Sequence, residues 1–112
     1  MAKRGDVLVA RQRLGFGRDR ARERFVALQA DALDGLDTVL VAPLDEDSSL
    51  YQDDPLVVHV SAREAGADRP HVVLVHLLRA AQLDRFEAAV GGRLSRAAMG
   101  EIEALLRVAL AL

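Results

Sequence analysis

Cysteine and tryptophan are both absent from the 112 residues, and the chain has only one tyrosine and three phenylalanines. Without cysteine there is no disulfide framework, no thiolate nucleophile and no cysteine-ligated metal site. The scarcity of aromatic rings leaves little surface on which unpaired bases could stack. We therefore expect a core built mainly from valine, leucine and alanine.

Long hydrophobic runs are also lacking. No segment approaches the ~18 apolar residues that a membrane-spanning helix requires, and no secretory hydrophobic region follows Met1–Asp6. These features predict a cytoplasmic protein that does not enter the membrane. The length predicts a single domain, residues 1–112.

Charge is distributed unevenly along the chain. Residues 1–24 contain eight basic and three acidic residues, a balance of +5, whereas the other 88 contain seven basic and fourteen acidic residues, a balance of −7. Such asymmetry indicates an anionic partner, nucleic acid or an acidic peptide, at the N-terminal part. The alternative is that the two parts neutralise each other within one fold.

Four arginines recur at alternate positions before an apolar run: Arg18, Arg20, Arg22 and Arg24. In an extended segment they would all point to one side, and their planar donors suit a phosphate or a carboxylate. A solvated or internally paired loop is the alternative. Gly15 and Gly17 do not form a phosphate-binding loop, because the strand–Gly-x-Gly-x-x-Gly–helix context is missing.

The hydrophobic pattern predicts five short strands, and their spacing favours a small barrel. We expect these strands at residues 7–10, 25–29, 38–42 (ended by Pro43), 56–60 and 71–76. A short helical turn at 82–86 and a sixth strand at 88–90 are also predicted. Ser95 is expected to cap a C-terminal helix whose apolar stripe includes Met99, Ile102 and Leu106.

Two groups of polar residues invite a metal or acid–base interpretation. The histidines are His59, His71 and His76; His71 and His76 fall on opposite strand faces, and His59 lies in an apolar run, which favours a structural, hydrogen-bonded histidine. The acidic segment Asp45–Asp47 lacks the alternating ligands and glycine of a calcium loop, so a solvated loop is favoured. We expect neither a metal nor another cofactor.

Three stretches together resemble the MazF/PemK and CcdB superfamily of toxins. These are Lys3–Val7, the pair Phe25–Asp31 and Val39–Leu44, and the segment from Gly92 to Leu112. The resemblance covers nearly the full length. It implies an SH3-like barrel of five to six antiparallel strands with a C-terminal helix, a homodimer, and an antitoxin partner with an acidic segment.

For the MazF branch, the resemblance implies an endoribonuclease that cuts single-stranded RNA without a metal, the substrate's 2′-hydroxyl attacking the adjacent phosphorus. The family's arginine falls near Glu23, so Arg24 or Arg22 is the expected catalytic arginine, and Asp45 stands where a Thr or Ser is expected, with Ser48 or Ser49 as substitutes. The expected RNA-binding residues are Arg13, Arg18 and Arg20.

Two other functions remain open at this point. The CcdB branch implies a poison of DNA gyrase, and Arg24–Asp31 and Pro55–Val60 are similar to that branch, although the chain ends without an aromatic residue. The other alternative is a catalytically inactive relative that acts as a binding module.

Overall fold

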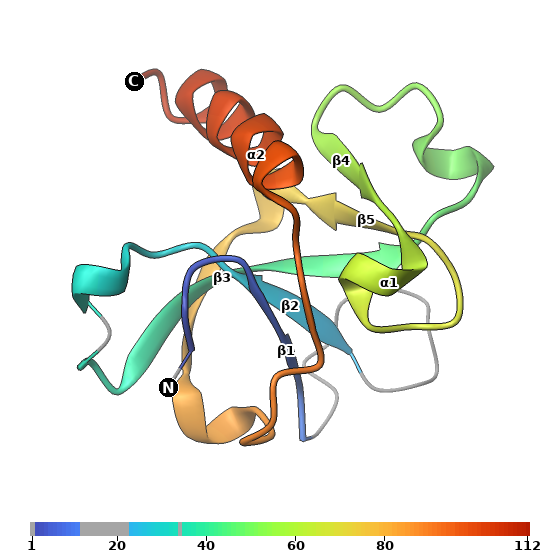
Figure 1. The fold of residues 1–112 in the computed structure, drawn as a ribbon. Coiled ribbons are helices and arrows are strands. Elements are labelled where there is room, and N and C mark those ends of the chain that lie inside the picture. Colours follow the sequence, from blue (N-terminus) through green and yellow to red (C-terminus); the bar gives the residue numbers. More distant parts are fainter. Residues whose placement is uncertain (1, 12–22, 34) are drawn as a thin grey trace.

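The fold is an antiparallel sheet, curled into a half-barrel, with a C-terminal helix on one face (Figure 1). The computed structural model describes residues 2–11, 23–33 and 35–112. The strands in this part of the chain are β1 (Asp6–Val9), β2 (Arg24–Ala27), β3 (Thr38–Glu46), β4 (Val57–Val60), β5 (His71–Leu74), β6 (Arg79–Gln82) and β7 (Gly92–Arg93).

Helical segments connect and cover the strands. The α-helices of the described chain are α1 (Ala62–Ala65) and α2 (Arg96–Ala109), and the short 3-10 turns are η1 (Asp31–Leu33), η2 (Ser49–Tyr51), η3 (Val75–Leu77) and η4 (Leu83–Arg85). Ser95 caps α2 by accepting a hydrogen bond from the backbone N–H of Ala98. The predicted fold class, the helical turn and the capped C-terminal helix are confirmed.

The strands follow the order β4-β5-β3-β2-β1-β7, and β6 pairs with the first half of β3. Several predicted elements differ from this arrangement. Residues 88–90 form no strand, and the chain instead forms β6 and the two-residue β7. The segment between the strands predicted at 56–60 and 71–76 contains α1, and the strand predicted at 71–76 ends at Leu74, where η3 begins.

The prediction that Pro43 ends a strand is wrong, because β3 continues through it to Glu46. On one side of β3, residues 38–41 pair with β6 and residues 44–46 pair with β5. Pro43 therefore falls between two partner strands on that side. A proline is tolerated there because it supplies no N–H to a neighbour. The extension carries Asp45 into the sheet.

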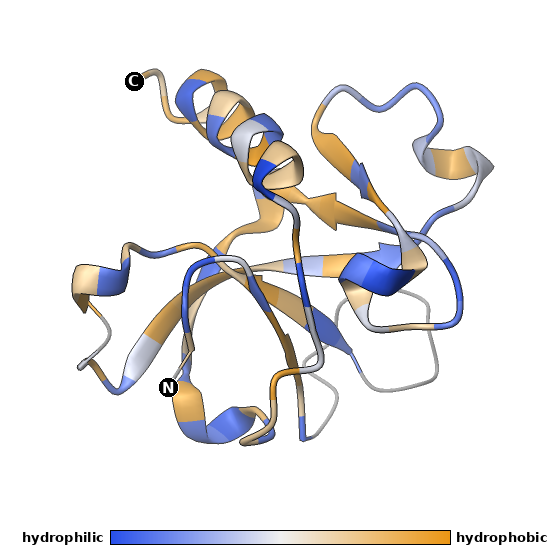
Figure 2. Ribbon diagram, viewed as in Figure 1, coloured by the Kyte–Doolittle hydropathy of each residue, from blue (hydrophilic) through white to orange (hydrophobic). Residues whose placement is uncertain are grey.

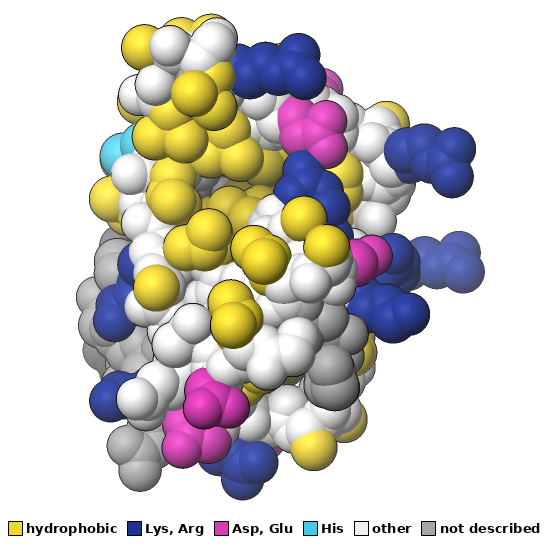
Figure 3. All heavy atoms as spheres, turned by 90° about the vertical axis from the view of Figure 1, so that its left-hand side faces the viewer, with side chains coloured by type: hydrophobic (Ala, Val, Ile, Leu, Met, Phe, Trp, Pro, Cys, Tyr) yellow, Lys and Arg dark blue, Asp and Glu magenta, His cyan; other side chains and the backbone are white. Residues whose placement is uncertain are grey.

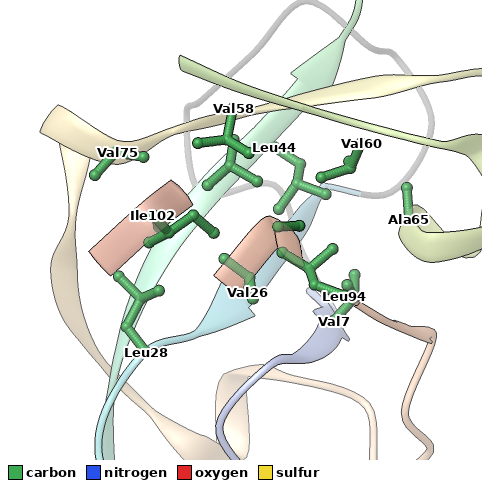
Figure 4. Packing of buried hydrophobic residues seen from close by; sticks show 13 residues of the cluster. Val7, Val26, Leu28, Leu44, Val58, Val60, Ala65, Val75, Leu94 and Ile102 are labelled. Carbon is green, nitrogen blue, oxygen red and sulfur yellow. The ribbon is translucent and has the colours of Figure 1, made fainter. Parts of the chain in front are cut away.

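Hydrophobic residues form three clusters, which lie on the two faces of the curled sheet. On the face covered by α2, Val26, Leu44 and Val58 pack around Ile102, which is fully buried (Figure 4). On the other face, Phe25 meets Phe86 edge to face at a ring-centroid distance of 5.6 Å. Figure 2 shows the hydrophobic residues concentrated on the strands, with mostly hydrophilic residues in the loop between β3 and β4. No helix of the described residues is long and apolar enough to span a membrane.

Glu64 joins α1 to the start of α2. Its side chain accepts hydrogen bonds from the backbone N–H groups of Ser61 (3.2 Å) and Ser95 (2.9 Å), the first as part of a capping box. Partial burial acts to raise the pKa of Glu64, but the hydrogen bonds from Ser95 and Ser61 outweigh it and hold the pKa below its ordinary value. The ionised carboxylate is therefore stabilised by folding.

Acidification is expected to weaken this link. Because the folded-state pKa of Glu64 is lowered, its contribution to stability is present above the ordinary glutamate pKa and is lost as the pH falls through the folded value. Glu64→Gln keeps an acceptor but loses the charge, so we expect a loss of about 1 kcal/mol at neutral pH and a flatter decline below pH ~4. Urea unfolding between pH 3 and 7 measures the loss at neutral pH and the decline of stability at lower pH. An identical pH slope in Glu64→Gln and the native chain would contradict this assignment.

Candidate functional site

The arginine-rich segment joins β1 to β2. Arg13, Arg18, Arg20 and Arg22 lie outside the described residues. The residues that flank the segment are described: the N–H of Ala10 donates to the carbonyl of Glu23 at 2.9 Å. The segment therefore leaves and re-enters the sheet at the same end of the β1–β2 pair.

Arg24 is the first residue of β2 and is partly buried. It stands opposite Val9 of β1 and Leu44 of β3. Residues directly opposite each other in a sheet point to the same face. Arg24 therefore belongs to the face that α2 covers.

Asp45 follows Leu44 in β3 and so belongs to the opposite face. The structure consequently does not bring Arg24 and Asp45 together across one groove. The register places Glu23, not Arg24, opposite Asp45. Both carboxyl groups are buried, with exposed fractions of 5% for Glu23 and 2% for Asp45. Two acids thus face each other where the sequence resemblance anticipates an arginine and a hydroxyl residue.

Asp45 is held by specific hydrogen bonds. Its Oδ2 accepts from the hydroxyl of Tyr51 at 2.5 Å, and its Oδ1 accepts from the N–H of Glu46 at 2.9 Å. The ring of Tyr51 packs against Val57, Val72 and Leu74. Asp45 therefore fixes η2 against the sheet, and a phosphate could reach this carboxylate only after Tyr51 moved.

Ser48 lies at the start of η2 and is exposed. Its Oγ accepts from the N–H of Leu50 at 3.4 Å, as an N-cap. A serine hydroxyl in this role still has its own proton to donate. Ser49, the other predicted substitute for the hydroxyl residue, is also exposed.

The three histidines have different environments. His71 is buried, and its Nδ1 lies 2.8 Å from the carbonyl of Arg69. His76 is exposed in η3. The side chain of His59 is 50% exposed, and its Nδ1 lies 2.8 Å from Oδ2 of Asp47. The predicted hydrogen bond of His59 is present, with Asp47 as its partner, and the side chain is half exposed rather than part of the core.

Neither metal coordination nor a strong anion pocket is evident among these residues. Within the described ranges, no group of three or more His, Cys, Asp or Glu could hold a metal ion. A cavity of 660 Å³ beside the start of α2 is lined by Arg4, Arg93 and Arg96. Arg4 is paired with Glu103 at 2.6 Å and Arg93 with Asp6 at 2.5 Å. Most of the positive charge that lines the cavity is therefore neutralised.

Comparison with solved structures finds the same fold in several toxins. An endoribonuclease bound to its cognate antitoxin, from a mycobacterial species, has a TM-score of 0.77 at 18% identity, with 100% of this chain and 97% of that chain covered. The MazF-mt6 toxin of Mycobacterium tuberculosis has a TM-score of 0.72 at 17% identity, with 96% of this chain and 97% of that chain covered. A MazE–MazF crystal structure from Deinococcus radiodurans has a TM-score of 0.74 at 17% identity, with 98% of this chain and 96% of that chain covered.

Comparison with curated protein sequences gives no match. A family model described as PemK-like, MazF-like toxin of type II toxin–antitoxin system matches residues 3–110. The match extends from the turn before β1 to the end of α2, so it includes the whole sheet and the buried residues of all three hydrophobic clusters. The chain belongs to the PemK-like and MazF-like toxins of type II toxin–antitoxin systems.

Proposed function

We propose that this toxin is a metal-independent endoribonuclease that cuts single-stranded RNA and leaves a cyclic phosphate. The observation that carries the proposal is the family match over residues 3–110. The mycobacterial structures with the same fold include an endoribonuclease in complex with its antitoxin. In this reaction the 2′-hydroxyl of the RNA attacks the adjacent phosphorus, and residues 1–112 act as one domain.

The arginine-rich segment supplies the positive charge in this proposal. Arg13, Arg18 and Arg20 bind the RNA backbone, and Arg22 or Arg24 neutralises the charge that develops on the phosphate. Arg24 lies on the face opposite Asp45 and Arg22 lies outside the described residues, so mutation of each decides which arginine acts. Asp45 then acts by holding Tyr51, and Ser48 donates its hydroxyl proton to the phosphate.

An apolar surface on α2 and its surroundings supports a homodimer. Hydrophobic side chains gather on the upper part of the face in Figure 3, where α2 lies. Val108, Leu110 and Leu112 are 75%, 53% and 85% exposed at the end of the chain. Burying such a surface against a second copy is favourable. The same toxin would bind an antitoxin with an acidic segment, as the N-terminal excess of arginine suggests, and would act in the cytoplasm, where its RNA substrate lies.

A cleavage assay tests the proposal. The purified protein is incubated with a single-stranded RNA of mixed sequence in EDTA, and Arg22→Ala and Arg24→Ala are compared with it. We expect the native chain to cleave and one of the two variants, Arg22→Ala or Arg24→Ala, to lose about 10²–10³-fold in rate. Absence of cleavage together with gyrase trapped on DNA would overturn the proposal in favour of a gyrase poison. If the protein neither cleaves RNA nor traps gyrase on DNA, the proposal is overturned in favour of a binding module.

A further inference from the structure

His59 and Asp47 form an exposed pair that the proposed site does not yet use. The Nδ1 of His59 lies 2.8 Å from Oδ2 of Asp47, and the two side chains are 50% and 29% exposed. An exposed ion pair contributes only ~0–1 kcal/mol to stability. The fold therefore has little need of this pair, and its accessibility suits a chemical role.

The sheet register places His59 on the same face as Asp45. His59 of β4 stands opposite Val72 of β5, and Val72 stands opposite Asp45 of β3. One residue beyond β2, Glu23 continues this row. Neighbouring strands lie ~4.8 Å apart, so the backbones at His59 and Asp45 are separated by roughly 10 Å. His59 therefore lies two strands from Asp45 and three strands, roughly 14 Å, from Glu23, where the arginine-rich segment re-enters the sheet, and all three belong to one face.

The polar groups that face His59 fix its chemistry. Asp47 lies beside its Nδ1, the hydroxyl of Tyr51 is already donated to Asp45, and Val72 between them is apolar. In the neutral ring, a carboxylate beside Nδ1 favours the tautomer with its proton on Nδ1, and Nε2 then has a lone pair. The arrangement matches the carboxylate–imidazole part of a catalytic triad, in which the carboxylate orients the ring and stabilises its protonated form.

We infer that His59 is the general base of the RNA cleavage reaction and that Asp47 is its positioning residue. The inference rests on the proposed ribonuclease function. Nε2 of His59 takes the proton from the 2′-hydroxyl, the O2′–P bond forms, and the P–O5′ bond breaks. The departing 5′-oxygen takes a proton from solvent, and the imidazolium returns its proton to water. This base explains how cleavage could proceed although two acids occupy the facing positions Glu23 and Asp45.

The experiment measures single-turnover cleavage of a single-stranded RNA oligonucleotide in EDTA from pH 5 to 9. We expect the native rate to rise with pH with a slope of one and then level off. His59→Gln is expected to cleave at least ~100-fold more slowly, at a rate that no longer rises with pH. Its thermal unfolding midpoint should be unchanged. Asp47→Asn should retain the rise but lower the maximal rate, because the carboxylate that orients the ring is removed.

Glu46→Gln is the matched control. Glu46 forms another exposed pair nearby, with Arg69 at 3.4 Å, but it lies on the opposite face of β3. Its rate and pH profile should equal those of the native chain. Native cleavage with His59→Gln within threefold of it would overturn this inference and leave the proposed function intact. No cleavage by the native chain at any pH would overturn both.

Discussion

Gly66→Ala is expected to destabilise the protein by about 3 kcal/mol or more. Gly66 ends α1 in the left-handed region, with φ at 67° and ψ at 35°. A Cβ built there would lie 1.8 Å from the carbonyl oxygen of Gly91 and 2.6 Å from its carbon. The obstacle is backbone, which cannot rotate away as a flexible side chain would. Strain at φ and overlap with the segment entering β7 therefore add together.

Gly100→Ala is the control for this prediction. Gly100 lies inside α2, and a Cβ there would have no heavy atom within 4 Å. Alanine loses less conformational freedom than glycine on entering a helix, so we expect a gain of about 0.5–1 kcal/mol. Denaturant unfolding of both variants measures the contrast. Equal stability of Gly66→Ala and Gly100→Ala would show that the close approach of α1 to β7 is not maintained.

Ile102→Ala is expected to cost about 3–4 kcal/mol. Ile102 is the α2 residue that is fully buried among the strands, where it is surrounded by Val26, Leu28, Val58 and Val75 (Figure 4). Truncation removes buried methyl groups and leaves a cavity between α2 and the sheet. Denaturant unfolding gives the free energy, and we expect near-ultraviolet circular dichroism to show loosened packing.

Glu101→Ala provides the comparison on the same helix. Glu101 neighbours Ile102 in sequence but is exposed, so we expect a change within about 0.5 kcal/mol. A loss of less than 1 kcal/mol in Ile102→Ala would mean that α2 is not docked through this residue. In that case the apolar surface proposed for the homodimer would need to be redefined.

Much of the fold follows from local patterns. Short runs of valine and leucine located β1, β2, β4 and β5, and Ser95 before a helical stripe located α2. The features that the sequence patterns did not predict depend on contacts between residues that are distant in sequence. Pro43 is accommodated because β3 changes partner from β6 to β5. β7 depends on backbone contacts of Gly92 with Glu64 and Gly66, for which a sequence pattern gives no signal.

The candidate site was predictable only in part. The positions of Arg24 and Asp45 near the β2–β3 pair could be expected, but their opposite faces depend on a strand register that composition does not reveal. The burial of Asp45 depends on Tyr51, six residues later in a separate turn. His59 was hidden within the apolar run Val57–Val60. Because Val58 and Val60 point into the core, strict alternation correctly places His59 on the opposite face of β4.

The chemical groups at the ends of the RNA fragments distinguish attack by the 2′-hydroxyl from metal-dependent hydrolysis. The native protein, purified and held in EDTA, is mixed with a single-stranded RNA, and the products are weighed by mass spectrometry. Attack by the substrate's own 2′-hydroxyl predicts a 2′,3′-cyclic phosphate on one fragment and a 5′-hydroxyl on the other. Intact RNA, or fragments that appear only when a divalent metal is added and that carry a 3′-hydroxyl and a 5′-phosphate, would contradict it.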